Sequence, residues 1–501
     1  MSLLGIDIGS TGTKAVVFDA EGAVLGAAYR EYPEIRPQPG WFELDPQSVW
    51  SAFTDVVRRA ASGAKSDPVQ ALSISALGVA VTPVDAAGNF LYNTITAPDS
   101  RTSHQATHLC EQVGEQEIFN ITGMPPHPSY TINKLMWMQQ NRPDVHRKAY
   151  KYLMWPEIVF FKLGLPLRVD WSLATRTMAF DVVNKHWSEE ILTAAGISAE
   201  LLAEPIRPGE VVGQLSGSAA RMLNLPRGCL VVAGGHDSAM TALGAGVIGS
   251  GQAVNSMGTV ECLMVAFAEP KRTEKMRQSG FCCYPHVVPG LYLTQAFNYS
   301  SGSILRWFRD NFAEAEQQQA AEENRSAYEL IVQDLPADPT GLLVIPYFAG
   351  AATPHMDPQA RGAIAGLTLS TDRKTFIKGL LEGTCFELRL NIEALAEAGL
   401  TVNRLPATGG GARSPAWLQL KANITGKEVA TLNVAEAGCL GGAILAGVAA
   451  GVYDSLPQAV NQLVHQATVY QPDSASKQQY DHYFALYKQL WSQIQTIAHQ
   501  L

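Results

Sequence analysis

The sequence predicts an α/β protein with more than one domain. It opens with an apolar strand over residues 3–8, a turn rich in glycine and hydroxyl side chains, and a second apolar strand over residues 15–18. A similar strand, glycine-hydroxyl turn and strand begins near residue 253 and ends near residue 267. Because 501 residues are too many for one hydrophobic core, we expect two to four domains of roughly 100–200 residues each.

The composition is that of a globular protein and argues against nucleic acid or a membrane as the main partner. Hydrophobic residues make up 47% of the chain and charged residues 17%, which suits a large buried core. The net charge is −9, and we interpret the most basic segment, 271–277, as a solvated loop. We find neither a secretion signal nor an apolar run that approaches about 18 residues, so we expect a soluble cytoplasmic protein. The seven scattered cysteines lack the spacing of a zinc site or a disulfide framework.

The first turn combines groups that suit phosphate and Mg²⁺. We expect Gly9 and Gly12 to have positive φ, which lets the backbone approach a ligand closely. Asp7, near the end of the first strand, offers a carboxylate for a hydrated Mg²⁺. Hydroxyl and cationic side chains that can bind phosphate follow it, namely Ser10, Thr11, Thr13 and Lys14. Hairpins of this composition also occur without a ligand, so the turn alone leaves both interpretations open.

The following elements begin with a third strand over 23–29, which continues an antiparallel meander. Asp45 and Pro46 have the pattern of an N-cap and a first helical residue. Further on, Asp99 and Arg101 are two residues apart and share a face of an extended segment. They could hydrogen-bond a polyol, or they could form an internal ion pair that only shapes the loop.

A second candidate site follows the apolar strand at 230–233. The segment Gly234-Gly235-His236-Asp237 places glycines and then a carboxylate at the end of that strand, which favours a cleft position for Asp237. The alternative is that Asp237 only caps the next helix. The later match to Gly-x-Gly-x-x-Gly at 244–249 follows a helical stretch instead of a strand, so we reject it as a dinucleotide site.

Two further glycine-rich turns suit a nucleotide. Gly258 and Thr259 form the turn of the repeated hairpin, and two such hairpins facing each other across a cleft would hold two parts of one polyphosphate. The strand at 405–408 leads into Gly409, Gly410 and Gly411, with Arg413 before a helix that begins near Pro415. Three glycines leave room for a base or an α-phosphate at the helix N-terminus, although a flexible turn is the alternative.

These motifs together resemble the FGGY carbohydrate kinases, within the actin-like ATPase superfamily. The helix expected at 129–141 satisfies the first FGGY signature at every position, including Lys134 and Trp137. Thr375 and Gly379 depart from the second signature at positions of helix packing. That signature is otherwise met at Gly362, Ile364, Gly366, Leu367, Phe376 and Glu382. The resemblance covers the chain from Gly5 to about Gly447, in the order of the family.

The resemblance implies two actin-like (ribonuclease H-like) domains, each with a mixed β-sheet flanked by helices, and an ATP and sugar cleft between them. We expect an N-terminal domain over 1–247 that binds sugar and phosphate, and a C-terminal domain over 248–501 that binds the nucleotide. Asp237 resembles the general base and Asp7 the residue that positions Mg²⁺. The remaining residues that resemble contacts to ATP are Ser10, Thr11, Gly12, Thr13, Lys14, Gly258, Thr259, Gly409, Gly410, Gly411 and Arg413.

The resemblance leaves the sugar open. The segment 77–79 reads Leu-Gly-Val, where xylulokinases usually carry Gln-Met-His and glycerol kinases have an Arg-Glu pair in the corresponding region. The residues around His236 and Thr259 look more like fuculokinase-type members. We expect a ketose or deoxyketose, such as L-fuculose or xylulose, phosphorylated at a terminal primary hydroxyl. The candidate sugar contacts are Asp99, Arg101, His236 and Asp237.

Other functions remain to be weighed against this one. The alternatives are a kinase of another polyol or an aldonate, and a non-catalytic actin-like ATPase. A sugar-sensing regulator on the same fold usually needs a DNA-binding module, for which the hairpin starting at residue 5 leaves no room. We expect ATP and Mg²⁺ as cofactors and a small sugar as the partner, without nucleic acid or membrane, and a homodimer is compatible with the chain.

Overall fold

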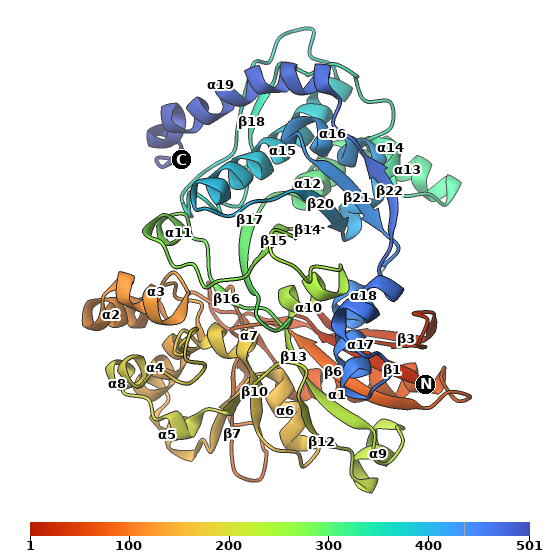
Figure 1. Cartoon of the computed structure of the whole chain (residues 1–501). Helices are drawn as coiled ribbons and strands as arrows, with labels where there is room; N and C mark the ends of the chain where they lie inside the picture. Colours follow the sequence, from red (N-terminus) through yellow and green to blue (C-terminus); the bar gives the residue numbers. More distant parts are fainter. Residues whose placement is uncertain (435) are drawn as a thin grey trace.

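The computed structural model describes residues 1–434 and 436–501, which form two lobes, each built on a mixed β-sheet with helices around it (Figure 1). The sheet of the first lobe has the strand order β12-β13-β6-β1-β2-β3. Its strands are β1 (Ser2–Ile8), β2 (Gly12–Phe18), β3 (Val24–Glu31), β6 (Val69–Ala76), β12 (Val211–Gln214) and β13 (Leu230–His236). The structure confirms the predicted α/β class and the opening strand, turn and strand.

The central strands β13, β6 and β1 run parallel, so their carboxyl ends meet at one edge of the sheet. In their register Asp7 lies opposite Ser75, and Ser75 lies opposite Gly235. Ligands of open α/β sheets bind at the carboxyl ends of the strands. This edge therefore presents Asp7 and the residues that follow Gly235 as the candidate site.

Helices cover both faces of the first sheet. Helix α1 (Pro46–Ser62) packs on β2 and β3, and Asp45 caps it by accepting hydrogen bonds from the backbone N–H groups of Gln47 and Ser48, as predicted. Its apolar side chains share a cluster with Leu4, Ile6 and Ile8 of β1. Residues of α17 (Ala437–Ala449) share a different cluster with Leu3.

Helix α17 comes late in the chain but packs on the sheet of the first lobe, against β1 and β6 (Figure 1). Small residues allow this approach, because a Cβ on Gly5 would lie 1.7 Å from the Cys439 carbonyl oxygen. A Cβ on Gly441 would lie 2.1 Å from the carbonyl oxygen of Met240 in α10 (Asp237–Gly244). Helix α17 therefore packs in the first lobe, although its residues belong to the expected second domain. The predicted domain boundary at residue 247 stays a prediction.

The sheet of the second lobe has the strand order β16-β17-β15-β14-β20-β21-β22. Its strands are β14 (Ala253–Met257), β15 (Glu261–Phe267), β16 (Tyr284–Pro285), β17 (Tyr292–Asn298), β20 (Arg404–Thr408), β21 (Glu428–Leu432) and β22 (Gln466–Tyr470). Strand β14 is antiparallel to β15 and parallel to β20, so the turn after β14 and the glycine turn after β20 emerge at the same edge. The two longest helices of this lobe are α15 (Arg373–Glu397) and α19 (Ser474–Ala498), and α16 (Pro415–Thr425) packs against both.

Shorter elements complete the two lobes. Residues 274–278, expected as part of a loop, form the short helix α11 because Thr273 caps it and Arg277 pairs with Glu274. The other helices are α2 (Ser103–Val113), α3 (Glu115–Thr122), α4 (Thr131–Asn141), α5 (Pro143–Lys148), α6 (Trp155–Lys162), α7 (Trp171–Ala174), α8 (Glu189–Ala195), α9 (Gly217–Leu223), α12 (Gly302–Phe312), α13 (Glu314–Glu323), α14 (Ala327–Ile331), α18 (Leu456–Leu463) and the 3₁₀ turns η1 (Thr175–Thr177), η2 (Ala199–Leu201) and η3 (Gly410–Arg413). The remaining strands are β4 (Glu34–Ile35), β5 (Glu43–Leu44), β7 (Thr82–Val84), β8 (Thr94–Ile95), β9 (Lys151–Leu153), β10 (Arg168–Asp170), β11 (Glu204–Ile206), β18 (Leu343–Ile345) and β19 (Ala363–Ala365).

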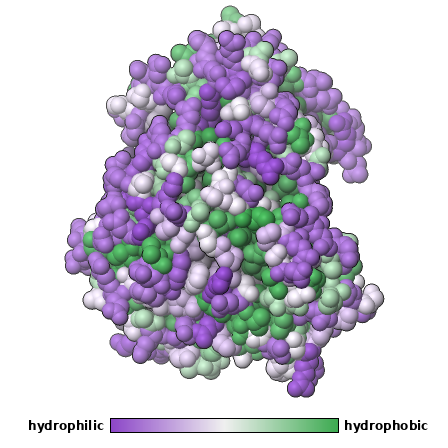
Figure 2. Space-filling model, viewed as in Figure 1, coloured by the Kyte–Doolittle hydropathy of each residue, from purple (hydrophilic) through white to green (hydrophobic). Residues whose placement is uncertain are grey.

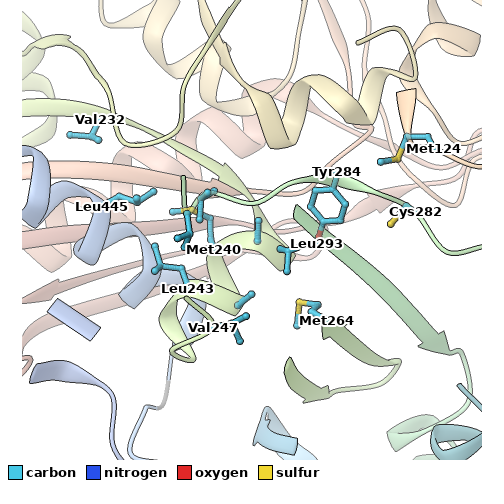
Figure 3. Close-up of a cluster of buried hydrophobic side chains, with 14 of the residues drawn as sticks. Met124, Val232, Met240, Leu243, Val247, Met264, Cys282, Tyr284, Leu293 and Leu445 are labelled. Carbon is cyan, nitrogen blue, oxygen red and sulfur yellow. The ribbon is translucent and has the colours of Figure 1, made fainter. Parts of the chain in front are cut away.

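One hydrophobic cluster joins the lobes. Met240 of α10 shares it with Met264 of β15 and Leu293 of β17, while Tyr284 lies close by (Figure 3). On the surface, hydrophobic residues gather across the middle of the face shown in Figure 2, whereas hydrophilic side chains cover most of the upper lobe. Among the described residues, no helix combines the length and the apolar character needed to cross a membrane.

Candidate active site

The tip of the β1–β2 hairpin presents Ser10 and Thr11 to solvent. The turn closes through a hydrogen bond of 3.0 Å from the Gly9 N–H to the Gly12 carbonyl, and the Tyr32 hydroxyl donates to the Gly9 carbonyl at 2.5 Å. The prediction of positive φ at Gly9 and Gly12 is wrong. Gly12 is instead the first residue of β2, where a Cβ would lie 2.6 Å from the hydroxyl oxygen of Tyr29.

The two other side chains predicted in this hairpin have partners within the protein. Thr13 is buried, and its hydroxyl donates to the Tyr32 hydroxyl at 3.4 Å, so its side chain supports the hairpin from inside. Lys14 Nζ lies 2.7 Å from Glu436 Oε1, just before α17, and 5.5 Å from the centre of the Tyr29 ring. The exposed hydroxyls of Ser10 and Thr11 therefore remain as the side-chain donors at the tip.

Asp7 occupies the carboxyl-end edge of the sheet. The Ser75 hydroxyl donates to its Oδ1 at 2.6 Å. Burial raises the pKa of Asp7 to about 6, and the negative charge of Asp237 acts in the same direction, while the bond from Ser75 opposes the change. The absence of a side chain at Gly438 leaves space beside the Asp7 carboxylate, because a Cβ there would lie 3.5 Å from the carboxyl carbon of Asp7.

Asp237 is the first residue of α10 and directly follows β13. Its side chain is 43% exposed, so the carboxylate is accessible to a substrate. The backbone N–H of Ser238 donates to Oδ1 at 2.5 Å and the Ser238 hydroxyl donates to the same oxygen at 3.1 Å. These bonds fix the carboxylate, and Oδ2 accepts no hydrogen bond from the described residues. An accessible carboxylate beside Asp7, at the end of a strand, is the arrangement that a general base requires.

His236 lies behind Asp237 and is largely buried. Its Nδ1 is 3.2 Å from Asp237 Oδ1, and its ring packs edge-on against Tyr284 with centroids 6.0 Å apart. Burial, together with the positive charge of Arg176, lowers the pKa of His236 to about 3, so the imidazole is neutral at pH 7. Gly78 makes room for both side chains, because its Cβ would lie 2.5 Å from His236 Cδ2 and 2.9 Å from Arg176 Cγ.

The second hairpin and the glycine turn line one cavity of about 640 Å³ in the second lobe. This volume is in the range of about 300–1,000 Å³ that is typical of small-molecule sites. The predicted residues that line it are Gly258, Thr259, Gly410, Gly411 and Arg413. The structure thus brings together two segments that lie about 150 residues apart in the chain, because β14 and β20 are neighbours in the sheet.

The three consecutive glycines have different environments. Gly409 has φ = 84°, and a Cβ there would lie 2.8 Å from the Met257 carbonyl oxygen. A Cβ on Gly411 would lie 2.9 Å from Met257 Cβ, whereas a Cβ on Gly410 would meet no atom within 4 Å. Gly409 and Gly411 therefore let the turn lie against the hairpin, and Gly410 leaves open space.

Three helices contribute cavity residues that the sequence did not predict. Arg306 of α12 lines the cavity, and its Nη2 donates to the Thr259 hydroxyl at 3.2 Å. Tyr328 of α14 and Trp417 of α16 add aromatic surface. In the sequence these residues belong to ordinary helical patterns far from either glycine turn, so no local signal identifies them.

Asp99 and Arg101 form an internal ion pair, which corrects their prediction as sugar contacts. Arg101 Nη2 lies 2.7 Å from Asp99 Oδ2, and both side chains are 0–1% exposed. The Phe42 N–H also donates to Asp99 Oδ2 at 2.7 Å, while the Arg101 guanidinium stacks 3.7 Å from the Trp41 ring centre. Protein groups occupy both oxygens of Asp99, so we assign the pair to shaping the loop.

Comparison with known proteins places these features in a family. Residues 2–244 match the N-terminal domain, and residues 253–450 the C-terminal domain, of the FGGY family of carbohydrate kinases. The chain is 28% identical to the xylulose kinase of Bacillus subtilis over 98% of this chain and 96% of that protein. It is 30% identical to the gluconokinase of the same organism over 95% of this chain and 93% of that protein. The gluconate kinase structure from Lactobacillus acidophilus superposes with a TM-score of 0.89 at 25% identity over 98% of both chains. The chain therefore belongs to the FGGY family of carbohydrate kinases and is a sugar kinase.

Proposed function

We propose that the protein transfers the γ-phosphate of MgATP to a terminal primary hydroxyl of a small ketose or deoxyketose. The observation that carries this proposal is the position of Asp7 and Asp237 at the carboxyl ends of β1 and β13, two parallel strands that lie on either side of β6. Phosphoryl transfer depends mainly on positioning and on stabilisation of charge, so one base, two phosphate-binding turns and a metal ion suffice. The family assignment favours a kinase over a non-catalytic actin-like ATPase.

Asp237 acts as the base in this mechanism. Its carboxylate accepts the proton of the acceptor hydroxyl as that oxygen attacks the γ-phosphorus, and the bond between this phosphorus and the oxygen bridging to the β-phosphate breaks to release ADP. The N–H and hydroxyl of Ser238 hold the carboxylate in place. His236, beside Asp237 and neutral, is the candidate contact to the sugar.

The turns and the cavity supply the nucleotide contacts. The Ser10 and Thr11 hydroxyls and the backbone of residues 9–14 bind the terminal phosphates, with Lys14 at the side of the turn. Gly258 and Thr259 bind the opposite side of the same polyphosphate, and the cavity between Gly410 and Tyr328 takes the nucleoside. Arg306 carries the positive charge nearest to the Thr259 hydroxyl and neutralises charge on the phosphates.

The residues around Asp7 fit a Mg²⁺ ion. The negative charges of Asp237 and Glu436 repel the Asp7 carboxylate, and a bound divalent cation would offset this repulsion. Within the described ranges no three His, Cys, Asp or Glu side chains meet as a cage, and Mg²⁺ is commonly held by one or two carboxylates plus phosphate oxygens. When bound, Mg²⁺ neutralises charge that develops on the transferred phosphoryl group.

An aldonate is the second candidate acceptor. Two observations favour it: the similarity to the gluconokinase, and the buried guanidinium of Arg176. This group lies 4.1 Å from the centre of the Tyr284 ring and donates to Gln295 Oε1 at 3.1 Å, and no salt bridge to it appears in the described part of the chain. A substrate carboxylate would supply the missing negative charge.

A coupled assay of ADP release tests the proposal. Purified protein with MgATP is supplied with D-xylulose, L-xylulose, L-fuculose, a series of polyols and D-gluconate. We expect turnover on a ketose or deoxyketose at least tenfold above the other acceptors, and phosphorus NMR of the product identifies the hydroxyl. Turnover on gluconate alone would replace the ketose by an aldonate, and the absence of turnover on every acceptor despite bound ATP would contradict the proposal.

A further inference from the structure

A buried ion pair lies beneath the second phosphate hairpin. Glu261, the first residue of β15, is 2% exposed, and Lys421 of α16 is fully buried. Lys421 Nζ lies 2.5 Å from Glu261 Oε1. Each charge has lost its water and depends on the other, because an unpaired charge at such a depth is strongly unfavourable.

The Glu261 carboxylate also binds side chains of two further elements. Asn255 of β14 donates from Nδ2 to Oε1 at 2.6 Å. The Ser301 hydroxyl, just before α12, donates to Oε2 at 3.1 Å. One carboxylate therefore connects β14, β15, the start of α12 and the middle of α16.

These connected elements form the walls of the nucleotide cavity. The N–H groups of Gly302 and Ser303 in α12 donate to the carbonyls of Gly258 and Thr259 at 3.2 and 3.1 Å. On the other side, Lys421 lies one helical turn after Trp417, whose ring centre is 5.3 Å from Nζ. Gly258, Gly302 and Trp417 all line the cavity, whereas Glu261 and Lys421 do not.

We propose that Glu261 and Lys421 are positioning residues that hold the second phosphate hairpin, the start of α12 and the glycine turn before α16 in the arrangement that binds ATP. This inference rests on the proposed function, since it takes the cavity as the nucleotide site. The pair contacts neither substrate. The Glu261 carboxylate binds side chains from β14, from the start of α12 and from α16, so it fixes the positions of these elements relative to one another. A misplacement of about 1 Å in such a site can lower the rate about 10²-fold.

The test separates positioning from stability. In the double variant Glu261→Met/Lys421→Met, both charges are replaced by apolar side chains of similar length, a change that need not lower stability. We expect this variant to keep its melting temperature within a few degrees but to bind MgATP at least about tenfold more weakly by calorimetry. The KM for ATP should rise to a similar extent, with the KM for the acceptor unchanged.

The chain offers a matched control pair. Lys378 and Glu382 form another buried ion pair, with Nζ 3.6 Å from Oε1, on α15 and outside the cavity lining. We expect the double variant Lys378→Met/Glu382→Met to bind MgATP as the wild type does. Tighter or unchanged MgATP binding by the Glu261/Lys421 double variant would overturn the inference.

A second variant covers the case in which the double variant does not fold. Glu261→Gln/Lys421→Met removes both charges, leaves no buried charge unpaired and keeps an amide oxygen that can accept from Asn255. We expect MgATP binding about three- to tenfold weaker, with equal binding again overturning the inference. Calorimetry with MgATP needs no acceptor. A wild type that does not bind MgATP would therefore count against the proposed function, whereas equal binding by wild type and variants would count against the ion pair alone.

Discussion

The Ser75 hydroxyl donates a hydrogen bond of 2.6 Å to Asp7 Oδ1 across the parallel pairing of β6 and β1. This bond directs the carboxylate along the sheet edge, where burial and, to a smaller extent, the charge of Asp237 raise the pKa of Asp7. Without a bound cation, the carboxylates of Asp7 and Asp237 repel each other. The arrangement therefore lowers stability in order to provide a site for a cation and a phosphate.

We expect Asp7→Asn to stabilise the protein while it abolishes activity. The pKa of Asp7 rises from 3.8 to about 6 on folding, so the folded state binds the proton more tightly, and stability falls as pH rises from about 4 through 6. At pH 7–8 the variant should melt a few degrees above the wild type, and the difference should shrink as pH falls towards 4. Turnover with MgATP should drop by about 10²-fold or more.

Thermal melts of Asp7→Asn and wild type from pH 4 to 8 check the first part, and steady-state rates check the second. A melting difference that is the same at all pH values would show that ionisation of Asp7 has no part in it. Wild-type turnover by the variant would remove Asp7 from the site.

Gly410→Ala should weaken nucleotide binding without a loss of stability. A Cβ on Gly410 meets no atom within 4 Å, so the methyl group would project into open space. Gly411→Ala is the matched comparison, because its Cβ would lie 2.9 Å from Met257 Cβ. We expect MgATP binding to be about tenfold weaker for Gly410→Ala at an unchanged melting temperature, and both quantities to fall for Gly411→Ala. Equal melting losses in the two variants would contradict this assignment of the glycines.

Asp99→Asn should lower stability and leave the KM for the acceptor unchanged. The Asp99 carboxylate neutralises the buried Arg101 and accepts the Phe42 N–H, so the variant would leave a buried cation with less compensation. Loss of one partner of a buried pair typically costs about 3–5 kcal/mol, here reduced because Glu43 Oε1 also lies 2.8 Å from Arg101 Nη1. Denaturant unfolding and acceptor titrations measure the two effects. A raised KM at unchanged stability would restore Asp99 as a sugar contact.

Much of the fold follows from local sequence patterns. Asp45 and Pro46 define the start of α1, and alternating and apolar runs define β1, β2, β14 and β15. The glycine turns at 258–259 and 409–411 are also visible in the sequence, because each follows a strand directly. Their meeting in one cavity depends on the pairing of β14 with β20, which no local pattern encodes.

The missed features depend on contacts between distant segments. Arg306 and Tyr328 occupy helices whose sequence shows only which residues face the core, so their place in the cavity depends on how α12 and α14 pack. Spacing alone left Asp99 and Arg101 between two interpretations, and the 2.7 Å contact between their buried side chains decides for the ion pair. The expectation of positive φ at Gly12 did not anticipate the Tyr29 side chain, which explains the glycine by packing.

The most direct test of the account compares wild type with Asp237→Asn on the best acceptor, with MgATP binding measured in parallel. Asp237 is fixed by Ser238, has an exposed carboxylate and is the proposed base. We predict that the variant binds MgATP as tightly as the wild type and loses about 10²–10⁴-fold in kcat. A variant with wild-type kcat would contradict the account, because the acceptor proton would then have to leave by another route.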